Sequence, residues 1–149
     1  MPDLRPVVLE TLKTIANKKV DAATEKLLVL SKLADEAQTK LDMLHQYRKD
    51  YMQRLADDLE AGMGAKALEN FRNFLLKLDE AVLGQQEVTD AAKHQLSMQR
   101  PIWQESQKKK LSYEVLSNQS ERRAHQRELK QDQKMMDEHA MRTLKFHRQ

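Results

Sequence analysis

The sequence has no cysteine, and its 149 residues include only three glycines and three prolines. Without cysteine, a disulfide framework and thiolate-ligated metals are excluded. A compact fold with many turns would need more glycine and proline than this. Aromatic residues make up only 5% and charged residues 33%, a composition typical of coiled coils and long helices. We therefore expect an all-α protein.

Long apolar runs are also missing, and short ones such as Leu27–Leu30 fall well below the roughly 20 residues that a membrane-spanning helix needs. The N-terminal stretch contains Asp3 and Glu10 and lacks the apolar core of a secretory signal. Any contact with a membrane is therefore expected to be peripheral. The absence of cysteine also fits a reducing compartment.

No pattern of catalytic or metal-binding residues is found. The sequence has no GxSxG, no GxGxxG and no glycine-rich phosphate loop. No histidine has a second ligand at the spacing of a recognisable zinc site. We therefore expect a protein that is not an enzyme and that uses no cofactor, metal or small-molecule substrate. The five histidines are His45, His94, His125, His139 and His147.

Apolar residues recur at alternating spacings of three and four between Ala16 and Leu55, which is the heptad pattern of a coiled coil. Alanine at several of these seam positions would let a partner helix approach closely. Arg48 is the one charged member, and a polar residue in a seam can fix the pairing register. The two series are Val20, Leu27, Ala34, Leu41, Arg48 and Leu55, and Ala16, Ala23, Leu30, Ala37, Leu44 and Tyr51.

Gly62 and Gly64 interrupt this pattern, and two glycines so close together favour a tight turn. The sequence predicts a single coiled-coil domain over residues 1–149, with a first helix over about 9–61, a turn at 62–64 and a second helix over about 65–145. The fold class is a long two-stranded antiparallel coiled coil, that is, a helical hairpin. Pairing about the turn should bring together residues whose numbers add up to about 126.

The second helix has a seam that runs from Leu68 to Trp103 at the same spacing. Trp103 is expected to anchor the core. Beyond it the seam is expected to become irregular, because Leu111, Val115 and Leu116 leave the register. Pro101 removes one backbone hydrogen bond, so a kink or a short break is expected there.

Because the second helix is the longer one, roughly its last thirty residues should have no partner within the chain. Such a polar single helix is marginal in water. We expect it to fray in the free protein and to become ordered on binding; the alternative is a solvated tail without a role.

Tyr47 and Phe74 should lie at the same height of the hairpin and on its flank, together with Ala81. These three side chains cannot all be fully buried between two helices. A partly exposed aromatic and aliphatic patch on a polar surface indicates a protein contact. The alternative is that these residues only widen the seam.

Several stretches resemble the FliJ family of the bacterial flagellar type III export apparatus. They are LETLKTIANKKVDAA (9–23), LDMLHQYRKDYMQRL (41–55), the Gly62/Gly64 turn, ENFRNFLLKLDEAV (69–82) and DQKMMDEHAMR (132–142). The resemblance covers nearly the whole chain in one register. Because heptads resemble each other by composition, its specificity comes from matches outside the seam, such as YRKDY and DQKMMDE.

The resemblance implies an antiparallel coiled coil similar to the γ stalk of rotary ATPases. It implies binding to the hexameric export ATPase FliI, to the export gate protein FlhA and to export substrate chaperones, which the protein would escort. It also implies a location in the cytoplasm, at the cytoplasmic face of the inner membrane. Pro101 departs from the family pattern. The gate-contact residues would be Leu44, Tyr47, Tyr51, Phe74, Leu78, Ala81 and Gln85, with Gln85 the weakest match.

Two other functions remain open at this point. One is a structural coiled coil that self-associates through its seam, whereas we expect a monomer when the chain is free. The other is a basic helical protein that binds nucleic acid through residues 108–148. The net charge of +3 comes from 26 basic and 23 acidic residues that are interspersed. We therefore expect no nucleic-acid binding, which would need basic side chains gathered on one face.

Overall fold

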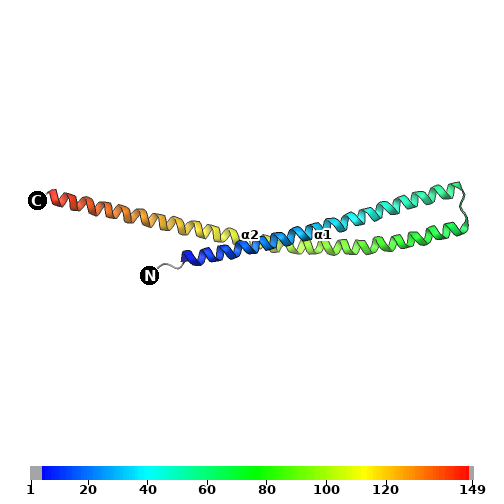
Figure 1. The fold of residues 1–149 in the computed structure, drawn as a ribbon, viewed down its shortest axis with the longest axis horizontal. Helices are drawn as coiled ribbons and strands as arrows, with labels where there is room; N and C mark the ends of the chain where they lie inside the picture. Colours follow the sequence, from blue (N-terminus) through cyan, green and yellow to red (C-terminus); the bar gives the residue numbers. More distant parts are fainter. Residues whose placement is uncertain (1–4, 148–149) are drawn as a thin grey trace. The chain divides into compact units, whose positions relative to one another are not determined.

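A computed structural model describes residues 5–147, which form two helices, α1 (Arg5–Ala61) and α2 (Ala65–His147) (Figure 1). The helices pack against each other, and the described residues contain no strand, so the predicted all-α hairpin is confirmed. Both helices extend slightly beyond their predicted bounds. Pro6 lies in the first turn of α1, where the missing backbone N–H has no partner to lose.

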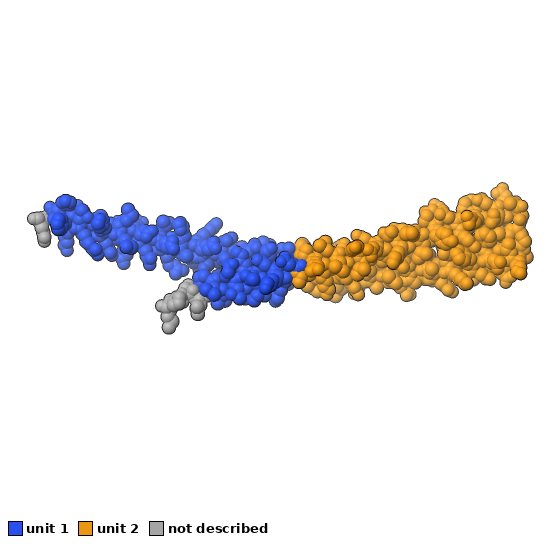
Figure 2. All heavy atoms as spheres, in the orientation of Figure 1, with its two compact units in different colours: residues 1–21, 105–149 blue, residues 22–104 orange. Residues whose placement is uncertain are grey.

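The chain divides into two compact units (Figure 2). Unit 1 comprises residues 1–21 and 105–149, and unit 2 comprises residues 22–104. Both helices therefore contribute to both units. Each unit is described by itself below.

Unit 2 contains the turn. Gly62 has a φ of 98°, in the left-handed region that side-chain-bearing residues rarely adopt, and its N–H donates to the carbonyl of Leu59 at 3.3 Å. The N–H of Leu68 then donates to the carbonyl of Gly64 at 3.1 Å as α2 begins. The predicted glycine turn is thus confirmed.

Polar contacts across the seam fix the pairing register of unit 2. Thr89 donates from Oγ1 to the carbonyl of Ala37 at 3.1 Å, and these two residue numbers add up to 126. The guanidinium of Arg48 bonds to the carboxylate of Asp79 on the facing helix. Trp103 donates from Nε1 to Oγ1 of Thr24 at 2.9 Å. The predicted register, the seam position of Arg48 and the anchoring role of Trp103 are confirmed.

Small side chains fill the centre of the unit 2 seam. The buried apolar residues on α1 are mostly alanines, so the two backbones can approach closely. Thr89 is fully buried and Gln99 is nearly so, because both residues occupy seam positions. The buried residues of this unit are Ala23, Ala34, Ala37, Leu41, Leu78, Thr89 and Gln99.

The seam of unit 1 corrects the prediction that the register is lost beyond Trp103. The heptad spacing continues on α2, but the positions are occupied by small or polar residues, and Leu111, Val115 and Leu116 are exposed instead. On α1, Ala16 and Val20 are buried. The seam residues of α2 in this unit are Ser106, Lys110, Tyr113, Ser117 and Ser120, of which Ser117 is buried and the others are half-buried.

One further expectation for α2 is corrected in part. The helix is continuous through Pro101, so the alternative of a short break is wrong, whereas a kink there stays a prediction. Gln99 and Trp103, seam residues on either side of Pro101, stay packed and hold the helix in place. Residues 121–147 are helical and all are exposed, in a stretch that is rich in good helix formers. Fraying of this stretch in the free protein stays a prediction. Within residues 5–147, neither helix has an apolar stretch long enough to cross a membrane.

Candidate protein-binding site

An aromatic cluster lies on both helices of unit 2, with two side chains from each helix. Tyr47 and Tyr51 are four residues apart on α1 and therefore share a face; their ring centroids are 6.4 Å apart. Tyr51 lies 4.8 Å from Phe71 and 4.6 Å from Phe74 on α2. Tyr47 meets Phe74 edge-on at 6.3 Å. These separations lie within the range of favourable aromatic pairs.

Burial in this cluster falls from the seam outward. Leu78 is only 6% exposed and Tyr51 is half-buried, whereas Phe74 is 36% and Tyr47 51% exposed. Ala81 is exposed as well. The prediction that Tyr47, Phe74 and Ala81 lie on the flank and are not fully buried is confirmed. A protein contact at this surface remains a prediction.

A hollow beside Tyr47 brings further residues into the site. Leu44 and Gln85, both named from the resemblance, line it together with Tyr47. The heptad pattern alone did not single out Met43, which is 66% exposed and lies four residues before Tyr47 on the same face. That spacing was the signal that could have identified it. The complete lining is Lys40, Met43, Leu44, Gln46, Tyr47, Asp50 and Gln85. We call the aromatic patch the set Leu44, Tyr47, Tyr51, Phe74, Leu78, Ala81 and Gln85.

Polar contacts on both sides hold the aromatic patch in place. The Arg48–Asp79 pair lies beside it. Gln85 donates from Nε2 to the carbonyl of Ala37 at 3.1 Å, and Thr89 donates to the same carbonyl. The side chain of Gln85 is therefore engaged in the seam, with its remaining surface in the hollow. The patch is consequently presented by helices whose register is fixed.

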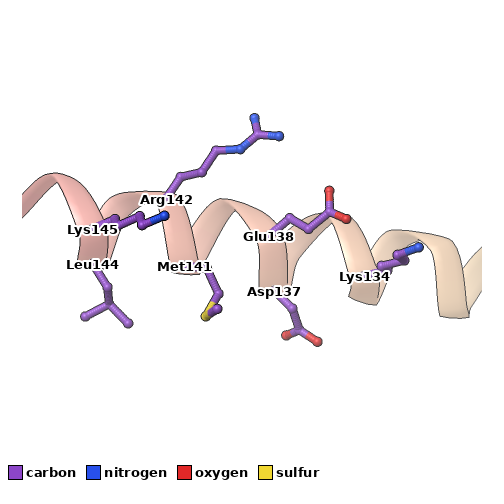
Figure 3. A pocket seen from close by; sticks show the side chains of 7 residues that line it. All are labelled: Lys134, Asp137, Glu138, Met141, Arg142, Leu144 and Lys145. Atoms are coloured by element: carbon purple, nitrogen blue, oxygen red, sulfur yellow. The ribbon is translucent and has the colours of Figure 1, made fainter.

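A second exposed surface lies on the last part of α2, in unit 1. Asp137, Met141 and Leu144 point to the same side of the helix, whereas Arg142 points away from them (Figure 3). Met141 is 70% and Leu144 64% exposed. A spacing of four and then three places them on one face. This face combines apolar and charged groups on a part of α2, residues 121–147, in which every residue is exposed.

The described residues contain no group of three or more histidine or carboxylate side chains that could hold a metal ion. The two exposed surfaces instead offer aromatic and aliphatic contact area with charged rims. Such surfaces are suited to binding another protein.

The sequence comparisons identify the family. The model of the family described as "Flagellar FliJ protein" matches residues 6–149. This chain belongs to the FliJ family. Curated FliJ proteins of Escherichia coli (strain K12) and Salmonella typhi are 27% and 28% identical to it over 134 residues, which is 90% of this chain and 91% of each relative.

A solved structure of a YscO homologue from Chlamydia trachomatis is also similar. It has a TM-score of 0.48 and 18% sequence identity, and the match covers 99% of this chain and 97% of that one.

Membership of the FliJ family makes this chain a component of flagellar type III protein export. Together with the two packed helices, it identifies a coiled-coil protein of a secretion system.

Proposed function

We propose that this FliJ-family chain acts by binding and not by catalysis, and that the aromatic patch of unit 2 contacts the export gate protein FlhA. The observation that supports the proposal most is the exposure of Tyr47 and Phe74 within an ordered aromatic cluster. Exposed aromatic side chains are typical anchors of protein interfaces. The patch needs no rearrangement to bind, because the contacts beside it already fix the register of the two helices.

The last part of α2 is proposed to engage the hexameric export ATPase FliI. Residues 121–147 are exposed all round, and the face with Met141 and Leu144 is available to a partner. Burying that face would remove apolar area from water. The start of α1 is proposed to take part in the same contact.

Escort of export substrate chaperones, and a location in the cytoplasm at the inner membrane, complete the proposed function. The free chain is proposed to be a monomer, because the Gly62 turn lets α1 and α2 satisfy each other's seams in unit 2. Sedimentation equilibrium should therefore give 17.4 kDa for the free protein. A dimer that persists on dilution would favour a self-associating coiled coil instead.

The gate contact is tested with Tyr47→Ala, measured by titration calorimetry against the cytoplasmic part of FlhA. Truncating an interface anchor costs about 1–4 kcal/mol of binding free energy. We expect helicity and melting temperature close to wild type, because Tyr47 is half exposed and lies at the edge of the cluster. Phe74→Ala should weaken gate binding similarly but lower the melting temperature more, since Phe74 also packs on Tyr51.

Two control variants separate binding from folding. Leu28→Ala removes a leucine that is 65% exposed away from the patch, so it should change neither property. Leu27→Ala changes a half-buried seam residue and should lower the melting temperature while leaving gate affinity intact at low temperature. If Tyr47→Ala instead reduces gate binding only in proportion to the unfolded fraction, the aromatic patch is part of the seam and the proposal is wrong.

A further inference from the structure

The two flanks of unit 2 differ in chemistry. In a two-stranded coiled coil, the heptad positions beside the seam are normally charged or polar. On one side of unit 2 these positions are instead mostly apolar or aromatic. Several of their side chains are exposed to solvent: Val88 and Ile102 are each 57% exposed and Leu33 is 50% exposed. We call this side the groove flank, defined by Leu33, Tyr47, Phe74, Ala81, Val88 and Ile102.

The opposite side, the polar flank, follows the usual pattern. Its heptad positions are polar from Ser31 to His45 on α1 and from Gln86 to Arg100 on α2, and Lys93 donates from Nζ to Oε1 of Gln38 across the helices at 2.6 Å. Two helices that only had to pair with each other would have no need for this asymmetry. The polar flank is defined by Ser31, Gln38, His45, Gln86, Lys93 and Arg100.

Three hollows follow one another along the groove flank. The hollow at Tyr47 shares Lys40 and Gln85 with a second one, which is lined by Leu33, Val88 and several alanines. The second hollow shares Gln95 with a third, which includes Met98 and Ile102. Together they extend along α1 from Lys26 to Asp50. At 1.5 Å per residue this is roughly 36 Å, the length of a helix of nearly seven turns.

Within the part of the chain that the structure describes, two ammonium groups on the groove flank are unpaired. Of the two carboxylates on its rim, Glu36 lies 4.0 Å from the ammonium of Lys32, and Asp50 accepts a hydrogen bond from the neutral amide of Gln46 and keeps its charge. Lys26 and Lys40 line the hollows, are exposed, and make no hydrogen bond or ion pair within residues 5–147. They lie two heptads apart on one face. An occupant with acidic groups at the same spacing would complement them.

We propose that the groove flank is a docking surface for one acidic amphipathic helix, which the partner bound at the aromatic patch supplies. Its apolar stripe would lie over Leu33, Val88 and Ile102, and its carboxylates would meet Lys26 and Lys40. The result is a local three-helix arrangement, with the alanines of the second hollow giving the third helix room to approach. The proposal rests on the proposed function for the identity of the partner, and extends its contact well beyond the aromatic patch.

The first arm of the test uses two designed peptides of about 25 residues. Both peptides carry the same stripe of leucines along one helix face. The positions beside this stripe are glutamate in one peptide and lysine in the other. Fluorescence anisotropy with the full-length chain should show that the glutamate peptide binds at least tenfold more tightly. The double variant Lys26→Glu, Lys40→Glu should reverse this preference. Equal binding of the two peptides, or no reversal, would overturn the proposal.

Matched variants locate the binding. Leu33→Ser and Val88→Ser should each weaken the glutamate peptide about tenfold. Leu28→Ser and Leu83→Ser change residues that are 65% and 67% exposed but line none of the hollows, so they should leave binding unchanged. Similar losses in all four variants would mean non-specific apolar contact and would overturn the proposal.

The second arm repeats these variants with the cytoplasmic part of the gate protein. Val88→Ser should weaken gate binding three- to tenfold, whereas Leu83→Ser should not. If Tyr47→Ala abolishes gate binding while Val88→Ser leaves it unchanged, the proposed function stands and the docking surface is wrong. If the wild-type chain binds the glutamate peptide but not the gate protein, the proposed function fails, and with it the assignment of this partner.

Discussion

Units 1 and 2 share one heptad register but differ in what fills it. In unit 2 the seam contains leucines, aromatics and small residues, together with cross-helix polar contacts such as that of Arg48 with Asp79. In unit 1 the α2 side of the seam contains serines, Lys110 and Tyr113. One carboxamide oxygen there, Oδ1 of Asn17, is buried without a hydrogen-bond partner. Regular spacing therefore establishes that helices can pair, whereas side-chain chemistry decides how strongly they do.

The difference has a functional counterpart. Unit 2 has the contacts that hold the aromatic patch and the groove flank in a fixed register. Unit 1 contains the long exposed part of α2 and a seam that buries little apolar area. Folding stability is therefore expected to come mainly from unit 2.

The largest expected loss of stability follows from Leu41→Ala in unit 2. Leu41 is 3% exposed, and truncating a buried leucine costs about 2–5 kcal/mol in the free energy of unfolding. We expect the lower half of this range, because a seam between two helices collapses more easily than a globular core. Urea unfolding followed by circular dichroism measures the loss.

Val20→Ala in unit 1 serves as the comparison, since Val20 is equally buried at 4%. It should cost clearly less, about 1 kcal/mol, because fewer methyl groups are lost. If it destabilised the whole chain as much as Leu41→Ala, the proposed dominance of unit 2 would be wrong.

A smaller loss is expected from Thr89→Val, which keeps the side-chain shape and removes only the hydroxyl. Oγ1 of Thr89 lies 3.1 Å from the carbonyl of Ala37 and 2.8 Å from that of Gln85. Removing one hydrogen-bonding group costs about 1 kcal/mol. The carbonyl of Ala37 keeps its bond from Gln85, which limits the loss.

Thr39→Val is the matched control, because Oγ1 of Thr39 bonds only within α1, to the carbonyl of Asp35. Its effect on thermal unfolding should stay below about 0.5 kcal/mol, as is usual for surface substitutions. An equal effect of the two variants would show that the cross-helix bond does not stabilise the pairing.

The smallest change in stability is expected from deleting everything after Ser120. All described residues from 121 to 147 are exposed, so the deletion removes no buried contact. The melting temperature should stay within a degree or two of wild type, whereas binding to the export ATPase should fall sharply in a pull-down. A truncated chain that binds the ATPase as well as the intact chain would show that this segment is only a solvated tail.

The pairing of unit 2 could be predicted from the sequence because it depends on two local signals, a heptad of apolar residues and a glycine turn. The continuation of the seam into unit 1 could not be predicted, because a heptad is recognised by its apolar residues, and Ser106 and Ser117 at these positions are not apolar. Apolar residues such as Leu111 therefore suggest a loss of register, whereas in the structure they lie outside the seam and are exposed. The aromatic patch was predicted from the heights of Tyr47 and Phe74 along the hairpin.

Other features depend on contacts that no local pattern encodes. Trp103, two residues after Pro101, donates a hydrogen bond to Thr24, which lies far away in the sequence. The shared acceptor of Gln85 and Thr89 likewise appears only once Ala37 is brought opposite them. The groove flank could be recognised only with both helices in place. The sequence of one helix does not show which of its two flanks lies next to an apolar flank of the other helix.

The turn at Gly62 has a consequence for how such a chain can change in length during evolution. The turn fixes the point at which the chain reverses. If α1 of unit 2 gained one residue, each residue of α1 from the insertion back to Thr24 would therefore be displaced by one position relative to its partner on α2, including the pair of Thr24 and Trp103. A gain of seven residues in both helices, at matching heights, would instead preserve every existing pair and add one new layer of seam. Relatives with coiled coils of different length are therefore expected to differ by whole heptads, inserted at matching positions in both helices.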